Sequence, residues 1–145
     1  MNATRILPDL QASLLCEDVK QEANGNFIII GVYNFIRVPQ LPIVAARLCV
    51  FSRWTAGVGQ FTESIKFIAP DQTTVLRKGE MKFELKDPTL QSTNVLGFGN
   101  FEFKTAGNYF VEVIVDDVMK LRYPVPVILA PPPNQNPQAA SEKKA

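Results

Sequence analysis

The chain has 145 residues, with 15 Lys and Arg against 14 Asp and Glu, two Cys and no His. The lack of histidine excludes Ser-His-Asp and Cys-His triads, His-Glu-x-x-His zinc sites and any acid–base step on an imidazole. Two cysteines are too few for a Cys₄ zinc or iron–sulfur site. The sequence therefore predicts no cofactor and no metal.

Positive and negative charges balance in the first 130 residues. Residues 131–145 contain one Glu and two Lys, which leaves 13 basic and 13 acidic residues in the part that precedes them. Nonspecific nucleic-acid binding depends on neutralising phosphates, so this balance argues against a nucleic-acid partner. A chain of this length can fold as one domain without a disulfide or a metal.

The N-terminal segment gives no sign of a membrane or secretory signal. Its first fifteen residues contain one Arg and are interrupted by Pro8 and Asp9, so the apolar core of a signal peptide is missing. No apolar run approaches the ~20 residues of a membrane helix. We expect no membrane contact and a cytoplasmic location, in which Cys16 and Cys49 are free, buried thiols rather than a disulfide.

Residues 10–23 (LQASLLCEDVKQEA) are the one segment with conflicting signals. They are rich in good helix formers, Leu10, Leu14 and Val19 lie near helical spacing, and Asp9 is a fair N-cap. As a strand, Leu10, Ala12, Leu14 and Cys16 alternate, and Glu17-Asp18 would need a bulge before Val19. Periodicity alone leaves helix and strand both open.

The rest of the chain shows a period of two, with one apolar and one polar face. The alternating runs are separated by Gly, Pro, Asn and Asp turn signals, including a hairpin tip at 55–59 and an Asp-Asp turn after Val115. The runs cover residues 27–35, 47–54, 60–68, 81–86, 109–115 and 118–125.

This pattern predicts an all-β domain over residues 1–130. About eight strands without a long helix build an antiparallel sandwich of immunoglobulin-like or C2-like type, or a flattened barrel. Residues 131–145 (PPPNQNPQAASEKKA) lack Val, Ile, Leu, Phe, Tyr and Trp and hold four of the eleven prolines. Such a composition predicts a disordered, proline-rich tail.

Three stretches together resemble a known family. They are Leu-Leu-Cys-Glu-Asp-Val at 14–19 with Phe-Ile-Ile-Ile-Gly-Val-Tyr at 27–33, Phe-Ser-Arg-Trp-Thr-Ala-Gly at 51–57 leading into 61–71, and Phe-Lys-Thr-Ala-Gly-Asn-Tyr at 103–109. In order and spacing they are similar to small, uncharacterised bacterial β-sandwich proteins that form a domain of unknown function. The resemblance covers most of residues 10–130. It implies that the first stretch is an opening strand, not a helix, and it assigns no catalytic residue.

Tyr109 follows Gly107-Asn108 at the start of a strand. This arrangement is similar to the tyrosine corner of immunoglobulin-like sandwiches, in which the hydroxyl bonds to a backbone group a few residues upstream. We expect a structural role for Tyr109.

Two further motifs have simpler structural explanations. Residues 97–103 (GFGNFEF) superficially resemble an RNA-recognition strand, but Leu96 replaces the leading basic residue and Asn100 an aromatic one. A core strand with a glycine-marked bulge explains this stretch better. The adjacent acids Asp116-Asp117 are explained by a two-residue hairpin turn rather than by a calcium site, which needs several carboxylates from different loops.

Four residues are candidates for an interaction surface. Arg53 and Trp54 end a strand beside a glycine hairpin, and these residue types are enriched at binding hot spots; the alternative places Trp54 in the core and Arg53 at its rim. Phe35 and Arg37 lie in residues 35–44, an apolar stretch without acids that contains two prolines. This stretch either crosses between the sheets and packs inward or exposes an apolar edge to a partner.

No catalytic constellation is recognisable, so we expect a non-enzymatic protein. The leading hypothesis is a protein-interaction or self-association module that acts through a sheet face or edge. The alternative is a small-ligand binder with a pocket lined by Trp54, Phe35 and Tyr33.

Overall fold

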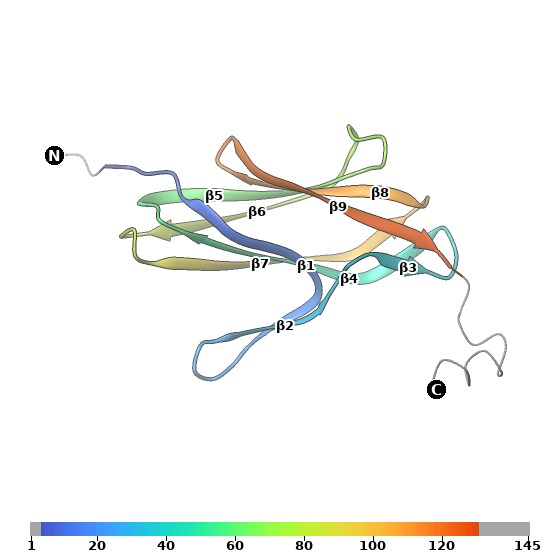
Figure 1. Ribbon diagram of the computed structural model, residues 1–145, viewed down its shortest axis with the longest axis horizontal. Helices are drawn as coiled ribbons and strands as arrows, with labels where there is room; N and C mark the ends of the chain where they lie inside the picture. Colours follow the sequence, from blue (N-terminus) through green and yellow to red (C-terminus); the bar gives the residue numbers. More distant parts are fainter. Residues whose placement is uncertain (1–3, 131–145) are drawn as a thin grey trace.

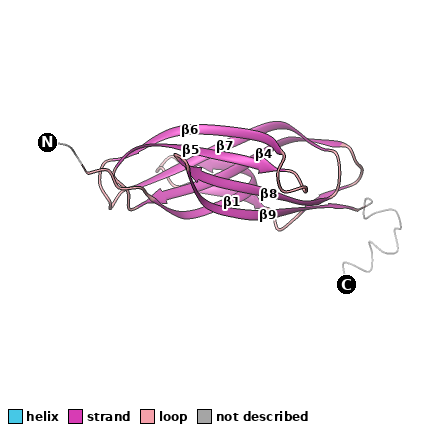
Figure 2. Ribbon diagram, turned by 90° about the horizontal axis from the view of Figure 1, so that it is seen from above, coloured by secondary structure: helices cyan, strands magenta, loops and turns pink. Residues whose placement is uncertain are grey.

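The computed structural model describes residues 4–130, which form two facing β-sheets (Figures 1 and 2). The described part contains no helix, and the predicted all-β fold is confirmed. It has nine strands rather than about eight: β1 Asp9–Gln21, β2 Phe27–Val32, β3 Ile36–Val38, β4 Ile43–Thr55, β5 Gly59–Ile68, β6 Val75–Leu85, β7 Gln91–Phe103, β8 Gly107–Val115 and β9 Val118–Leu129. The predicted tail, 131–145, lies outside the described residues.

The two sheets have the orders β2-β1-β4-β7 and β3-β9-β8-β5-β6. All neighbours pair antiparallel except β3 and β9, which are parallel. The predicted hairpin at 55–59 was wrong: residues 56–58 join β4 to β5, which lie in different sheets and do not pair, so this turn connects the two layers. The predicted turn after Val115 is a hairpin connection between β8 and β9. Asp116 occupies the left-handed region there (φ 52°), which Asp tolerates better than most residues.

The segment with conflicting signals is a strand, as the family resemblance implied. Cross-strand pairing decides this, because β1 has β2 on one side and β4 on the other. The bulge lies between Leu10 and Ala12, not at Glu17-Asp18. It shifts the phase of the strand, so Leu15 is in the core while Leu14 is 37% exposed. The alternation predicted for this strand was therefore wrong beyond Leu10.

The far end of β1 and all of β2 form a hairpin that stands apart from the two layers (Figure 1). Phe27 of β2 makes an edge contact with Phe51 on the outer face of β4, with ring centroids 6.4 Å apart. Cys16 and Cys49 pair across β1 and β4; both are free and fully buried, as predicted. Burial raises the pKa of the Cys16 thiol to about 11, which keeps it protonated and unreactive.

The apolar stretch 35–44 crosses between the sheets and packs largely inward. Ile36 and Val38 are buried in β3, and the backbone N–H of Ala130 donates to the Val38 carbonyl at 2.8 Å. Phe35 (38%) and Val44 (55%) remain exposed. The short strand β3 was not among the predicted runs, because it is only three residues long.

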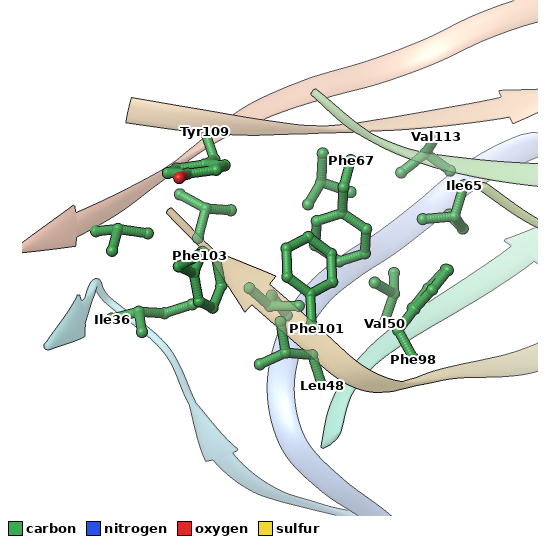
Figure 3. Close-up of a cluster of buried hydrophobic side chains, with 14 of the residues drawn as sticks. Ile36, Leu48, Val50, Ile65, Phe67, Phe98, Phe101, Phe103, Tyr109 and Val113 are labelled. Carbon is green, nitrogen blue, oxygen red and sulfur yellow. The ribbon is translucent and has the colours of Figure 1, made fainter. Parts of the chain in front are cut away.

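One end of the core is a cluster of rings, named here the aromatic end (Figure 3). Its members are Phe67, Phe98, Phe101, Phe103 and Tyr109, and successive centroids lie 4.8–5.3 Å apart. The glycine-marked bulge expected in residues 97–103 was wrong: β7 pairs with β4 from Gln91 to Phe103 without a register shift, although Asn100 has a φ of 51°. All three phenylalanines of β7 are buried in the core on either side of Asn100. The Tyr109 hydroxyl donates to the Thr105 carbonyl at 2.7 Å, the hydrogen bond expected of a tyrosine corner.

Candidate functional site

A row of polar residues crosses the middle of the apolar core. Ser13 of β1 lies opposite Ser52 of β4, which lies opposite Asn94 of β7. Glu63 enters the core from β5 of the facing sheet and is fully buried, as Ser52 and Asn94 nearly are. With Tyr123 of β9 these residues are named the polar layer. Burying such groups is costly unless they are hydrogen-bonded.

Hydrogen bonds satisfy most of the polar layer. Asn94 Nδ2 donates to Glu63 Oε1 at 2.7 Å, and Ser92 Oγ donates to Asn94 Oδ1 at 2.8 Å. The Ser13 hydroxyl lies 3.4 Å from that of Ser52 and 3.3 Å from that of Tyr123. Glu63 Oε2 has no hydrogen-bond partner among the described residues. One carboxylate oxygen is thus bonded and the other is not.

The polar layer reaches the surface through a side pocket between β1, β2 and β9. The pocket has a volume of about 270 Å³ and is lined among others by Ser13, Leu14, Val32, Tyr33, Leu121 and Tyr123. Burial raises the pKa of Tyr123 to about 12, so its hydroxyl is a neutral donor and acceptor. Among the described residues, no charged side chain lines the pocket. It can hold a small uncharged group, such as one side chain of a partner, below the usual size of a drug-like ligand site.

Large apolar side chains surround this pocket and continue along β2. The set is named the open-side surface and is exposed by 36–48% per residue; it consists of Leu14, Ile28, Ile30, Val32 and Leu121. Three of the five alternate along β2, on the face opposite to Phe27. A group of neighbouring apolar side chains on a solvent-exposed surface marks an interaction site more often than isolated apolar residues do.

The four predicted surface residues do not come together. Trp54 is fully buried and stacks on Phe83 with centroids 5.7 Å apart, so it belongs to the core and not to a surface. Arg53 bonds Gln91 on the outer face, and its Nε is buried without a partner in the described part of the chain. Both residues lie near the connection from β4 to β5, which joins the two sheets.

Phe35 and Arg37 lie at the opposite end, beside the C-terminal end of β9. The Arg37 guanidinium lies 5.5 Å from the Phe35 ring centroid, a cation–π contact within one segment. Neither residue lines the side pocket. Of the residues proposed for a ligand pocket, only Tyr33 lines it.

The sequence reasoning missed Glu63, although a signal was present. In residues 60–68 the odd positions Phe61, Ile65 and Phe67 point inward, and Glu63 shares their phase. Ser52 likewise shares the phase of Val50 and Trp54. A polar residue in the apolar phase of a strand is the pattern that identifies the polar layer.

The comparison with known families settles the relationship of the chain. Residues 11–128 match the model of a family of unknown function, DUF6941. The chain belongs to this family. The match agrees with the predicted resemblance to an uncharacterised domain, and no curated protein matches the chain.

Two further properties of residues 4–130 bear on the site. No group of three or more Cys, Asp and Glu side chains there converges in a way that could hold a metal ion. None of that part forms a helix long and apolar enough to cross a bilayer.

Proposed function

We propose that this member of the DUF6941 family is a non-enzymatic interaction module that binds a protein chain through the open-side surface. The observation that supports this is the coincidence of five exposed large apolar residues with a side pocket sized for one side chain. A pocket that takes an anchor residue, ringed by apolar contacts that exclude water, is the usual anatomy of a binding hot spot.

The core carboxylate supports a non-enzymatic role. Glu63 is fully buried, and its bonded oxygen faces an amide rather than a pocket. General acid–base work requires a group within hydrogen-bond reach of a substrate. Within residues 4–130, the polar groups that line the side pocket are neutral hydroxyls and an amide, and we assign no cofactor. The balanced charge argues against a nucleic-acid partner, and two free thiols fit a cytoplasmic, reducing location.

The test uses tagged protein purified from its source cells, with mass spectrometry of what co-elutes. We expect a stoichiometric protein to be retained by wild type and lost from Leu121→Glu. The matched control is Val75→Glu, which charges a residue of comparable exposure (47%) on β6. Retention of the same partner by Leu121→Glu, or no partner with wild type, would refute the proposal.

A second candidate function is supported by the hydroxyls of the side pocket. Ser13 and Tyr123 would bond an uncharged small ligand, while Leu14, Val32 and Leu121 would contact its apolar part. The probe is p-cresol, compared with toluene, which has the same shape without the hydroxyl. Ligand binding predicts that p-cresol raises the melting temperature more than toluene does, and that Tyr123→Phe removes the difference. Equal shifts for both probes would eliminate this candidate.

A further inference from the structure

We infer that this chain also pairs with a second copy of itself through the free backbone edge of β2, which joins two four-stranded sheets into one. This inference goes beyond the proposed function, because pairing along the β2 edge requires neither Leu121 nor the side pocket. It derives from a comparison of the edges of β6, β7, β9 and β2. An unprotected edge strand offers a row of unpaired N–H and C=O groups to another strand.

The β6 edge is protected by charge. It carries both signs along its length and offers no apolar run; its charged residues are Arg77, Lys78, Glu80, Lys82 and Glu84. β7, at the other side of the four-stranded sheet, lies beside β6. There the Arg77 guanidinium donates to the Gly99 carbonyl at 3.0 Å, so a side chain already occupies this edge. Neither edge is suited to pair with a further strand.

The β9 edge is protected by proline. The N–H of Ala130 points away from β8, toward β3, and residues of the same parity along the strand share that direction. Pro124, Pro126 and Arg122 have this parity, so two of these three positions that face the free edge before β3 have no donor. The three residues of β3 pair with the remainder of the edge.

β2 has none of these devices. Its sequence, Phe-Ile-Ile-Ile-Gly-Val, contains no charge and no proline. Gly31, at φ 67° with the Glu17 side chain packed over it, turns the end of the strand. The regular part of this strand edge therefore covers residues 27–30. Ile28 and Ile30 are 44% and 36% exposed on this strand.

A second copy fits this edge better than an arbitrary strand does. Two β2 strands related by a two-fold axis pair antiparallel and place apolar side chains opposite apolar side chains, with no like charges facing each other. The overall charge of +1 adds little repulsion between copies. The β1–β2 hairpin stands apart from the sandwich (Figure 1), so two bodies can approach by their hairpins without collision.

The test combines sedimentation equilibrium with amide hydrogen exchange on the full chain. We expect a monomer–dimer equilibrium between low micromolar and millimolar concentration, with exchange of the β2 amides slowed at least tenfold in the dimer. The variant Ile28→Glu places a carboxylate beside Lys20, its neighbour on β1, so the hairpin is retained. It should be monomeric over the same range, while Val75→Glu should dimerise as wild type does.

Three results would overturn the inference: a wild-type monomer throughout, a dimer without slowed exchange in β2, or an Ile28→Glu variant that dimerises like wild type. A monomer that retains a different protein in the purification experiment, lost from Leu121→Glu, would overturn the second copy but leave the proposed function standing. Should Ile28→Glu fail to fold in a thermal melt, the concentration dependence of exchange in wild type still decides.

Discussion

The aromatic end and the polar layer occupy the same core but are built by opposite means. In the aromatic end, rings from β5, β7 and β8 interlock, and its one polar atom, the Tyr109 hydroxyl, has a backbone acceptor. A few residues along the same strands, Glu63 and Asn94 replace apolar side chains, and one carboxylate oxygen has no partner in the described structure. The aromatic end stabilises by packing, whereas the polar layer imposes a desolvation cost that its hydrogen bonds only partly offset.

The largest effect should come from the aromatic end. Phe67→Ala removes a ring that contacts both Phe98 and Phe101 and leaves a cavity between the sheets. We expect the free energy of unfolding to fall by about 3–5 kcal/mol, measured by denaturant titration. Phe35→Ala is the control, because Phe35 is partly exposed and should cost well under half as much. Equal losses for the two variants would contradict the assignment of Phe67 to the central packing.

The next effect tests the polar layer. Asn94→Ala removes the donor to Glu63 Oε1 and leaves a fully buried carboxyl group without its amide partner. We expect a loss of about 2–3 kcal/mol in the free energy of unfolding. Ser92→Ala serves as the control: it removes the hydroxyl that bonds Asn94 but leaves the amide on Glu63. A loss for Asn94→Ala no larger than that of Ser92→Ala would show that Glu63 does not depend on Asn94.

A third substitution should act in the opposite direction. Glu63→Gln keeps the acceptor for Asn94 and removes the charge that burial disfavours. We expect the free energy of unfolding at neutral pH to rise by about 1 kcal/mol. Glu112→Gln, at a carboxylate on the outer side of β8, should change it little. A destabilised Glu63→Gln variant would mean that the carboxylate contributes to the fold more than its contacts indicate.

The alternation of a strand predicts which side chains face the core, but it does not predict which strands pair. Alternation places Phe67 and Val113 inside because apolar residues of one phase share a face. The same rule places Glu63 inside, although a carboxylate is usually exposed to water. Only the registers of β1, β4 and β7 bring Ser13, Ser52 and Asn94 into one row. Pairing between strands distant in sequence is not encoded in any one run.

The same limit applies to the open-side surface. Leu14 alternates with Leu10 and Ala12 in the sequence, but a one-residue bulge at the start of β1 shifts the phase, so Leu15 is in the core and Leu14 is partly exposed. Bulges invert every later side chain of a strand, so local alternation cannot determine which residues a surface contains. Trp54, in contrast, shares the inward face with Leu48 and Val50 as its spacing indicated. The burial of Trp54 therefore follows from the alternation within β4 alone.

The smallest effect contrasts Glu63 with a carboxylate whose hydrogen bonds are complete. Asp71, in the β5–β6 turn, accepts backbone N–H bonds from Thr73 and Thr74, each 2.8 Å long, and a bond from the Thr74 hydroxyl. These bonds, with the Thr74 hydroxyl first, lower the pKa of Asp71 from 3.8 to about 2.

Because the folded pKa is depressed, the stabilising contribution of Asp71 is complete above pH 3.8. It is lost as the pH falls from there toward 2. Carboxyl-carbon NMR should show Asp71 titrating well below 3.8, and Thr74→Val should move the Asp71 pKa back toward that value. An unchanged pKa in that variant would contradict the contribution of the Thr74 hydroxyl. The two carboxylates thus differ in surroundings rather than in chemistry: the turn supplies donors for both oxygens of Asp71, whereas the core supplies one donor to Glu63.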